Sequence, residues 1–402
     1  MLQEQAERDV RHNLPTIEAT EPALDRKVEF LSKAESYPHP VSKVIRRETH
    51  MSWVFLAGDR VYKLKKPVRF RYLDFSTLQR REVACRAELR LNRRLAPDVY
   101  LEVVPLTITP RGLSLGENAT VIDWLVVMRR LDERQTLERA IEEQCVERWQ
   151  LDVLAETLVQ FYRYAPAVPL SAVQHLLDWR RSLAYNRQVL LGRESSGPPG
   201  LVRRIDFVQR WFLKRHANVL VGRVQARCIV DGHGDLRPEH IWLGDPVRVI
   251  DCLEFNPRLR AVDPFDEIAF LSLECERLGA LWAGEYIRRR ITAGLRDGLS
   301  AELFLFYRCH RATLRARLAI AHLFEPNPRT PEKWPRLARE YLRIAAADAT
   351  RLERSLKKQG DLSARRRHAA AGSLPQGAAR RATHRACRGR APARVEKRAR
   401  HR

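Results

Sequence analysis

The segment His-Gly-Asp-Leu-Arg-Pro-Glu-His at residues 233–240 is followed by Val-Ile-Asp-Cys-Leu-Glu at residues 249–254. Strand-like apolar residues lead into both segments, and each carries one aspartate, Asp235 or Asp251. A unit of loop, strand, turn and strand of this length brings the two aspartates to the same end of a hairpin, with His240 nearby. Two carboxylates and an imidazole in one pocket predict a site for a divalent metal ion and a general base.

The residues before position 131 show a β-rich pattern. Short runs of β-branched and aromatic residues are separated by turns that contain Gly. One helical pattern interrupts these runs, with apolar side chains spaced three and four residues apart. We expect strands at Ser52–Leu56, Arg60–Lys65, Val99–Ile108 and Val121–Met128, and a helix from Ser76 to Leu95.

The second part of the chain has a helical pattern. Leu, Ala, Arg and Glu dominate residues 136–190 and 266–355, and residues 228–252 form a short strand–loop–strand segment between them. A β-rich part followed by a larger helical part predicts an α+β fold with two lobes.

The two aspartate segments resemble a known family. His-Gly-Asp-Leu followed by Ile-Asp-x-x-Glu is similar to the catalytic and metal-binding segments of aminoglycoside phosphotransferases and choline-kinase-like enzymes, which share the protein-kinase architecture. The resemblance implies a two-lobed protein-kinase-like fold, with a small antiparallel-sheet N-lobe that contains one helix and a larger, mainly helical C-lobe.

This resemblance sets the expected domain boundaries. We expect a helical N-terminal extension at residues 1–45 and a β-rich nucleotide-binding N-lobe at 46–131. A helical C-lobe at 132–358 would carry the catalytic and metal loops at 228–256. A disordered basic tail is expected at 361–402, where thirteen Lys and Arg residues stand against two acidic residues.

The resemblance also implies roles for the residues of the C-lobe. Asp235 takes the place of the catalytic base, His233 holds the loop, and Asp251 is the principal metal ligand. His240 stands where the family has a metal-binding Asn. Glu254 is either a second metal ligand or a cap for the following loop.

A third motif follows the metal loop. Asp263-Pro264-Phe265-Asp266 resembles the Asp-Pro-x-x-Asp helix start of the same family. Its expected role is structural, because the first aspartate caps a helix that anchors the catalytic loop.

The N-lobe contains a matching lysine. Val61-Tyr62-Lys63-Leu64 resembles the kinase strand whose lysine binds the α- and β-phosphates of ATP. Glu88 lies on the apolar stripe of the following helix and is the expected partner of Lys63, with Glu82 as the alternative. Lys65 alternates onto the same strand face, so the register could differ by two residues.

Three further residues are expected at the nucleotide. Ser52 ends the first predicted hairpin turn, whose hydroxyl and backbone N–H groups would contact phosphates, since no Gly-rich loop is present. Met128 and Arg130 lie in a segment that resembles the strand and hinge against which adenine packs.

Two strings mark one branch of the family. Ser-Trp-Val-Phe-Leu-Ala-Gly-Asp-Arg at 52–60 and Leu-Asn-Arg-Arg-Leu-Ala-Pro at 91–97 resemble a branch of unknown substrate that is sometimes fused to a P-loop kinase. These residues contain no Gly-x-x-x-x-Gly-Lys-Ser/Thr motif, so we expect no P-loop kinase module within them.

Together these features predict an ATP- and Mg²⁺-dependent phosphotransferase that acts on a hydroxyl of a small molecule. Histidine at position 240 favours transition metals over magnesium, so a nucleotide-binding pseudokinase with a regulatory role is the first alternative. The net charge of +24 and the basic tail make a nucleic-acid-binding protein the second. Seven unpatterned cysteines and the lack of a signal peptide or membrane-spanning run predict a cytoplasmic protein without membrane contact.

Overall fold

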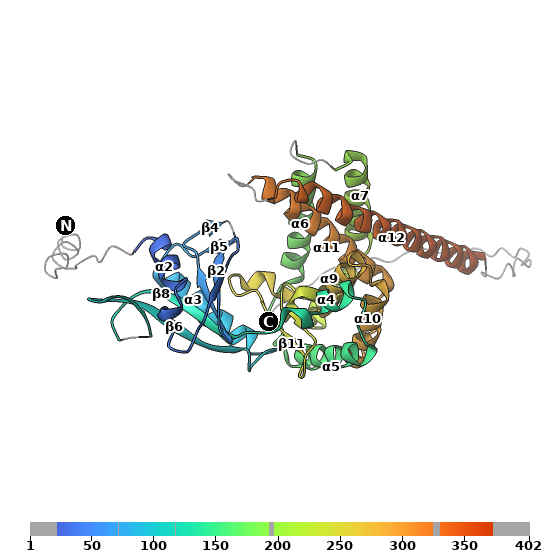
Figure 1. Cartoon of the computed structure of the whole chain (residues 1–402). Helices are drawn as coiled ribbons and strands as arrows, with labels where there is room; N and C mark the ends of the chain where they lie inside the picture. The colour runs from blue at the N-terminus through green and yellow to red at the C-terminus, as the bar shows by residue number, and fades with distance from the viewer. Residues whose placement is uncertain (1–21, 71, 117, 193–196, 325–329, 373–402) are drawn as a thin grey trace, which may run out of the picture. The chain divides into compact units, whose positions relative to one another are not determined.

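The computed structural model describes residues 22–372, except residues 71, 117, 193–196 and 325–329, and it describes side chains up to residue 358 (Figure 1). The chain divides into two compact units, residues 1–356 and residues 357–402. The predicted N-lobe, and the predicted C-lobe up to residue 356, lie within the first unit. The predicted N-terminal extension is described only from residue 22, where helix α2 (Leu24–Leu31) and the 3-10 helix η1 (Ala34–Ser36) precede the sheet.

The β-rich part forms a single antiparallel sheet of six strands in the order β1-β2-β3-β8-β6-β7. A tight turn joins β2 to β3, with Gly58 at a φ of 63° that favours glycine. The predicted strands are confirmed, with small shifts at their ends. The bounds are β1 Val44–Glu48, β2 Ser52–Ala57, β3 Arg60–Lys65, β6 Tyr100–Thr109, β7 Gly112–Leu115 and β8 Thr120–Arg129, and a separate hairpin pairs β4 Arg69–Phe70 with β5 Leu73–Asp74.

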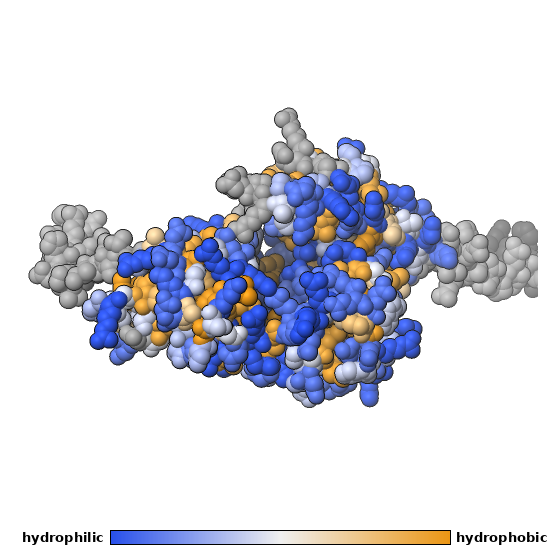
Figure 2. All heavy atoms as spheres, viewed as in Figure 1, coloured by the Kyte–Doolittle hydropathy of each residue, from blue (hydrophilic) through white to orange (hydrophobic). Residues whose placement is uncertain are grey.

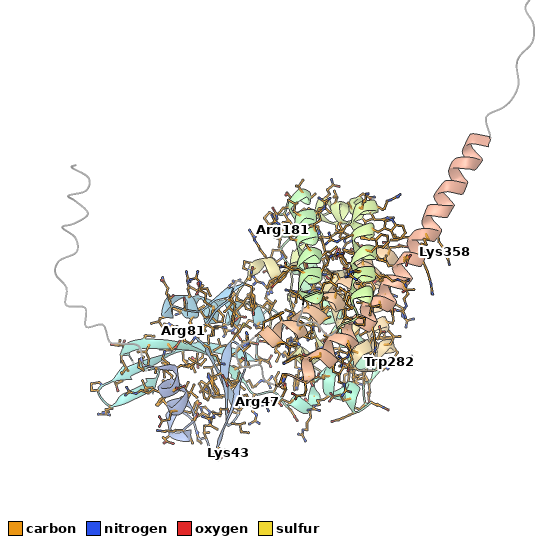
Figure 3. All side chains as sticks on the ribbon, turned by 90° about the horizontal axis from the view of Figure 1, so that it is seen from above. Lys43, Arg47, Arg81, Arg181, Trp282 and Lys358 are labelled. Carbon is orange, nitrogen blue, oxygen red and sulfur yellow. The ribbon has the colours of Figure 1, made fainter. Side chains whose placement is uncertain are left out.

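Helix α3 (Leu78–Asn92) packs against β8 and β6. A buried ion-pair network joins it to α2 through the sheet. The carboxylate of Asp123 in β8 accepts hydrogen bonds from Lys27 of α2 at 2.7 Å and from Arg81 of α3 at 2.8 Å. Arg81 is labelled in Figure 3 and is fully buried. Because an unpaired buried charge is costly, this network holds both helices on the sheet.

The larger part is helical and shares one continuous hydrophobic core. Helix α9 lies at its centre, because it packs against α10, α11 and the loop that carries the His-Gly-Asp motif. The helices are α4 Leu137–Glu142, α5 Arg148–Tyr164, α6 Ala172–Leu190, α7 Pro199–Arg215, α8 Ala217–Gln225, α9 Pro264–Arg277, α10 Leu281–Leu295 and α11 Ala301–Ala321. Two short 3-10 helices, η2 Glu133–Gln135 and η5 His322–Phe324, flank them.

Short strand pairs hold the two aspartate segments in place. β9 (Val230–Asp231) pairs with β12 (Ala261–Val262), and β10 (Ile241–Trp242) pairs with β11 (Arg248–Val249). The 3-10 helix η3 (Pro238–His240) lies between β9 and β10, and η4 (Pro257–Leu259) precedes β12. The predicted strand–loop–strand segment, residues 228–252, therefore contains the β10–β11 pair, and β9 near its start pairs with β12 beyond its end.

The last described helix, α12 (Lys333–Gly372), continues beyond residue 361, where the sequence predicted a tail. The remainder of that predicted tail, residues 373–402, lies outside the described residues. In the described part of the chain, no helix has the length and apolar character needed to cross a membrane. On the face shown in Figure 2, hydrophilic residues predominate and the apolar ones form small, interrupted patches.

This architecture confirms the predicted fold class. A small antiparallel sheet, with helix α3 and the short helix α2 packed on it, precedes a larger, mainly helical part, as in protein-kinase-like folds (Figure 1).

Candidate active site

The loop after β9 carries the His-Gly-Asp motif, and hydrogen bonds to helix α9 hold it in place. The buried carboxylate of Glu267 accepts hydrogen bonds from the backbone N–H groups of His233, at 3.1 Å, and Gly234, and from the hydroxyl of Tyr162 at 2.8 Å. Gly234 has a φ of 89°, so this turn favours glycine. Burial raises the pKa of Glu267, and these donors oppose that effect.

His233 links the two aspartate segments through both of its ring nitrogens. Its Nε2 lies 2.9 Å from the carbonyl of Ile250, which only accepts, so Nε2 carries the proton. Its Nδ1 accepts a hydrogen bond from the backbone N–H of Asp235 at 3.3 Å. Burial, aided by neighbouring His240, lowers the pKa of His233 to about 4, so the ring is neutral near pH 7.

Asp235 has one oxygen held and one open. Its Oδ2 accepts two hydrogen bonds from Arg237, at 2.8 and 3.0 Å. Its Oδ1 makes no hydrogen bond with any residue that the structure describes. Burial favours a higher pKa for Asp235, but the charges of Arg237 and His240 outweigh it and lower the pKa. The carboxylate is therefore ionised, with its free oxygen available to a ligand.

The carboxylate of Asp251 likewise has one oxygen bound and one oxygen open. Its Oδ1 is 2.9 Å from the ammonium nitrogen of Lys63, and its Oδ2 lies 3.6 Å from Nε2 of His240. The side chain is 46% exposed, so it faces open space. The charge of Lys63 lowers the pKa of Asp251, although burial opposes this shift. Its oxygen Oδ2 is the one left for a cation.

The backbone of Asp251 is unusual. Its φ of 62° lies in the left-handed region, which Asp and Asn enter more readily than most residues do. Two hydrogen bonds hold this conformation from either side. The N–H of Asp251 donates to the hydroxyl of Tyr100 at 3.1 Å, and the N–H of Cys252 donates to Oδ1 of Asn92 at 2.8 Å.

Lys63 and Lys65 both reach the carboxylate of Glu88. Lys63 lies 2.9 Å from its Oε1, and Lys65 lies 2.6 Å from its Oε2. Lys65 also binds Glu254. Burial opposes the charge of Lys63, but Asp251 and Glu88 raise its pKa well above the ordinary range. The structure thus brings Lys63 to Asp251 and places Lys65 deeper, between two buried carboxylates.

The expected partner of Lys63 is accordingly Glu88. The alternative, Glu82, lies one and a half turns earlier on α3 and pairs with Arg86 at 2.8 Å on the exposed side of the helix. The sequence left open whether Lys63 or Lys65 pairs with the glutamate of α3. In the structure both lysines bind Glu88.

Of the three expected metal ligands, Asp251 is the most exposed, with 46% of its side chain accessible against 9% for both Glu254 and His240. Glu254 is engaged by Lys65. The Nδ1 of His240 donates to the carbonyl of Asp235 at 2.9 Å, and its Nε2 lies 3.2 Å from a nitrogen of Arg237. No group of three or more metal-ligating side chains occurs among the described residues. One carboxylate still fits Mg²⁺, which proteins often bind through one or two carboxylates, water and phosphate oxygens.

The expected nucleotide contacts occupy different environments. Ser52 is buried, and its backbone N–H and carbonyl are both bound by Thr49 within the β1–β2 turn. Met128 packs on the cluster that also contacts Ile250, next to Asp251. Arg130 follows β8 and borders a cavity of about 470 Å³. Their contact with a nucleotide stays a prediction.

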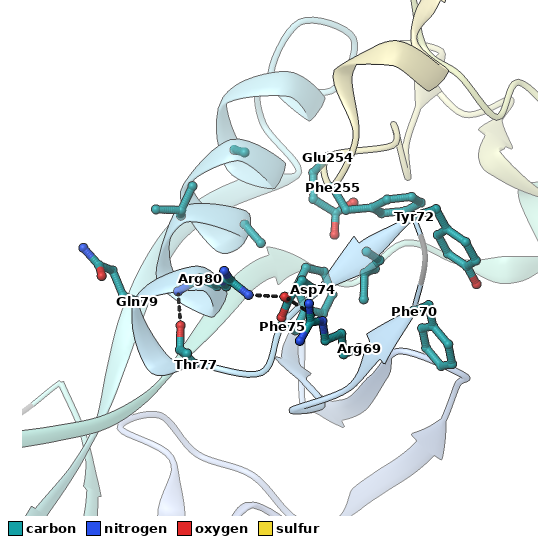
Figure 4. Close-up of a pocket in the computed structure, with 14 residues that line it drawn as sticks. Arg69, Phe70, Tyr72, Asp74, Phe75, Thr77, Gln79, Arg80, Glu254 and Phe255 are labelled. Carbon is teal, nitrogen blue, oxygen red and sulfur yellow. Dashed lines mark hydrogen bonds and ion pairs between the residues drawn. The ribbon is translucent and has the colours of Figure 1, made fainter. Parts of the chain in front are cut away.

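A larger cavity, of about 1290 Å³, is lined by α3, the β4–β5 hairpin and the segment Glu254–Phe255 (Figure 4). Aromatic side chains of the β4–β5 hairpin line it together with Phe255, and Asp74 binds Arg80 at its rim. It includes Glu254, but neither Asp235 nor Asp251. We therefore do not assign it to the nucleotide.

The Asp-Pro-x-x-Asp motif has the predicted structural contacts. Asp263 caps α9 by accepting a hydrogen bond from the N–H of Phe265 at 3.0 Å, and it binds Arg223 at 2.6 and 2.9 Å. Asp266 forms a two-point ion pair with Arg311 at 2.6 and 2.8 Å. These contacts fix the helix whose Glu267 supports the loop with the His-Gly-Asp motif.

Sequence reasoning missed Arg237, Asn92 and Tyr100. Arg237 stands inside the motif that was recognised, so its position two residues after Asp235 was an available signal. Asn92 and Tyr100 contact the Asp251 loop only through the tertiary fold, and no local pattern indicates them.

The chain was compared with known proteins. No family model matches it. Uncharacterized proteins from Mycobacterium tuberculosis and Mycobacterium bovis are 34% identical over 300 residues, which is 72% of this chain and 58% of theirs. The chain thus spans less than two thirds of the length of these relatives.

Solved structures give more distant similarities. A choline/ethanolamine kinase family protein from Mesorhizobium loti is 15% identical, with a TM-score of 0.44 over 87% of this chain and 99% of that one. The GDP complex of aminoglycoside 2'-phosphotransferase-IIIa is also 15% identical, with a TM-score of 0.47 over 81% and 99%. Choline kinase from Cryptosporidium parvum is 9% identical, with a TM-score of 0.46 over 83% and 97%.

The architecture described above is the two-lobed arrangement that the sequence predicted. The solved structures named here carry the names of the family that the sequence motifs resemble.

Proposed function

We propose that the chain is an ATP- and Mg²⁺-dependent phosphotransferase that acts on a hydroxyl of a small molecule. The observation that carries this proposal is that each of the two aspartates has one carboxylate oxygen bound and the other open. Arg237 and Lys63 each hold one carboxylate oxygen, of Asp235 and Asp251 respectively, and leave the other oxygen open. His240 lies between the two aspartates.

Each group has a defined part in this reaction. Lys63, kept charged by Glu88 and Asp251, would bind the α- and β-phosphates. Oδ1 of Asp235 would accept the proton of the substrate hydroxyl. The hydroxyl oxygen would at the same time form a bond to the γ-phosphorus of ATP. The bond between the γ-phosphorus and the β–γ bridging oxygen would break, and ADP would leave. When bound at Asp251, Mg²⁺ would neutralise phosphate charge.

The lowered pKa of Asp235 refines its role. Because Arg237 keeps the carboxylate ionised, Asp235 is a weak base that chiefly orients the hydroxyl. Catalysis of this kind depends on positioning and charge stabilisation more than on proton abstraction.

The test uses the full chain. We expect ATP to raise the melting temperature in the presence of Mg²⁺, and we expect a panel of hydroxylated small molecules to include one that accelerates ADP release. The same assay on Asp235→Asn should show nucleotide binding without transfer. Absence of any nucleotide-dependent shift would contradict the proposal.

A second candidate is a nucleotide-binding protein without transfer activity. His240 favours it, because its Nε2 lies 3.2 Å from Arg237 and it replaces an oxygen ligand of the family pattern. This candidate predicts a Mg²⁺-dependent melting shift but no ADP release above background with any acceptor or with water. ADP release that requires Asp235 would exclude it.

A further inference from the structure

The segment Leu91–Pro97, one of the two strings that mark the branch, has no part in the reaction proposed above. It forms the end of α3 and the turn into β6. Two of its side chains, Asn92 and Arg94, reach from the sheet part to the loops that carry the two aspartates. The segment therefore contacts both halves of the candidate site.

Asn92 connects Glu88 to the metal loop. Its Oδ1 accepts a hydrogen bond from the N–H of Cys252 at 2.8 Å, and its Nδ2 donates to the carbonyl of Glu88 at 3.0 Å. The side chain is 1% exposed, and both of its polar atoms are used. A buried amide with both ends engaged has one orientation, so it fixes the residue after Asp251 relative to α3.

Arg94 connects the same helix end to the catalytic loop. Its Nη1 donates to the carbonyl of Asp231 at 2.8 Å, and its Nη2 donates to the carbonyl of Gly232 at 2.9 Å. The guanidinium also lies 3.3 Å from the sulfur of Cys252. The two carbonyls directly precede the His-Gly-Asp motif, so Arg94 holds the entrance of that loop.

We propose that Asn92 and Arg94 are positioning residues that set the Asp251 and Asp235 loops in register with the Lys63–Glu88 pair. This inference rests on the proposed function. The C-terminal end of α3 would then set the positions of the Asp251 loop, the Asp235 loop and Lys63, because Glu88, the partner of Lys63, lies on the same helix. The left-handed backbone of Asp251 needs such support on its C-terminal side, and Asn92 supplies it through Cys252.

The neighbouring Arg93 provides a matched control. It also binds two backbone carbonyls, those of Tyr100, at 2.9 Å, and Leu101. These carbonyls lie in β6, within the sheet part. Arg93 contacts neither aspartate loop directly, so its loss removes a comparable anchor from the sheet part alone; the Tyr100 side chain that binds Asp251 stays in place.

The experiment compares full-chain Asn92→Ala and Arg94→Ala with Arg93→Ala. The readout is the Mg²⁺ concentration that gives half of the ATP-dependent melting shift. Loss of a residue that orients a metal ligand typically weakens metal binding 10- to 100-fold, so we expect Asn92→Ala to raise this concentration at least about tenfold. Arg93→Ala should leave it unchanged, and Arg94→Lys should recover part of the Arg94→Ala loss.

Hydrogen exchange gives a second readout that needs no nucleotide. Peptides covering residues 249–255 should exchange faster in Asn92→Ala, and peptides covering 230–236 faster in Arg94→Ala, than in Arg93→Ala. Equal exchange and equal Mg²⁺ dependence in all three variants would overturn the inference. A wild-type chain without a nucleotide shift would instead overturn the proposed function.

Discussion

The ammonium nitrogen of Lys63 lies 2.9 Å from Oδ1 of Asp251. This ion pair joins β3 to the loop after β11, across 188 residues of sequence. It places a strand lysine of the sheet part and a half-exposed carboxylate of the helical part at one point. Because Lys63 leaves Oδ2 of Asp251 open, the pair defines where nucleotide phosphates and a cation would meet.

The first prediction concerns Asp251. Asp251→Asn keeps a side chain that tolerates the left-handed backbone but removes the charge. With ATP at about 100 times its Kd, the wild-type chain should gain about 2.7 kcal/mol, and the variant should lose the Mg²⁺-dependent part of that gain. Thermal melting with ATP, with and without Mg²⁺, measures it. Asp98→Asn is the control, since Asp98 is 42% exposed and pairs with arginines, Arg129 and Arg248, rather than with Lys63 or His240. A variant that shifts like the wild type would exclude Asp251 as the metal ligand.

The second prediction separates the two lysines. Lys65→Met leaves the buried carboxylates of Glu88 and Glu254 without one shared partner, so the free energy of unfolding should fall by about 3–5 kcal/mol. Lys63→Met should cost less stability, because Asp251 is half exposed, and should instead weaken ATP binding. Urea unfolding and nucleotide titration measure the two effects. The double variant Lys65→Met, Glu254→Gln should recover part of the lost stability, and failure to do so would contradict the assigned pairing.

The third prediction concerns the pH dependence of turnover. Arg237 keeps the pKa of Asp235 low, so Arg237→Met should raise that pKa. Because the ionised carboxylate is the active form, the acid limb of kcat should move to higher pH. ATP hydrolysis, with water in place of the acceptor, suffices for the measurement. Asp235→Asn should abolish the activity, and an unchanged acid limb in Arg237→Met would show that another group controls it.

The fourth prediction concerns stability at acid pH. Burial lowers the pKa of both His233 and His310 from 6.5 to about 4. Between pH 6.5 and pH 4 the unfolded chain binds protons that the native chain does not, so the free energy of unfolding should fall with falling pH, by up to roughly 3 kcal/mol for each histidine. Urea unfolding across this range measures the slope. His310→Gln should reduce the slope, and an identical slope would exclude His310 as a contributor.

The sequence predicted the parts of the site that follow from local pattern. Asp235 and Asp251 could be found because each ends an apolar run within a recognisable motif. Glu88 could be preferred to Glu82 because helical periodicity places it on the apolar stripe of α3, and the structure brings it to Lys63. Periodicity and spacing gave these positions, and the family resemblance supplied their expected roles.

The parts that were missed depend on contacts between distant segments. Nothing near Glu254 indicates that Lys65 would take its carboxylate, since 189 residues separate them. Likewise, Asn92 and Tyr100 bind the backbone beside Asp251 only after the sheet and helical parts have formed. Sequence pattern identifies which side chains carry charge, but the fold decides which charges neutralise one another.

The left-handed backbone at Asp251 has a consequence for any library that randomises this position. Most L-residues pay about 1–2 kcal/mol to enter this region, whereas glycine enters it freely and asparagine enters it more readily than most. Selection for folded protein would therefore enrich Gly and Asn, which lack the carboxylate, over Glu, which retains it. The substitutions at position 251 that best preserve folding would therefore differ from those that best preserve a metal-binding carboxylate.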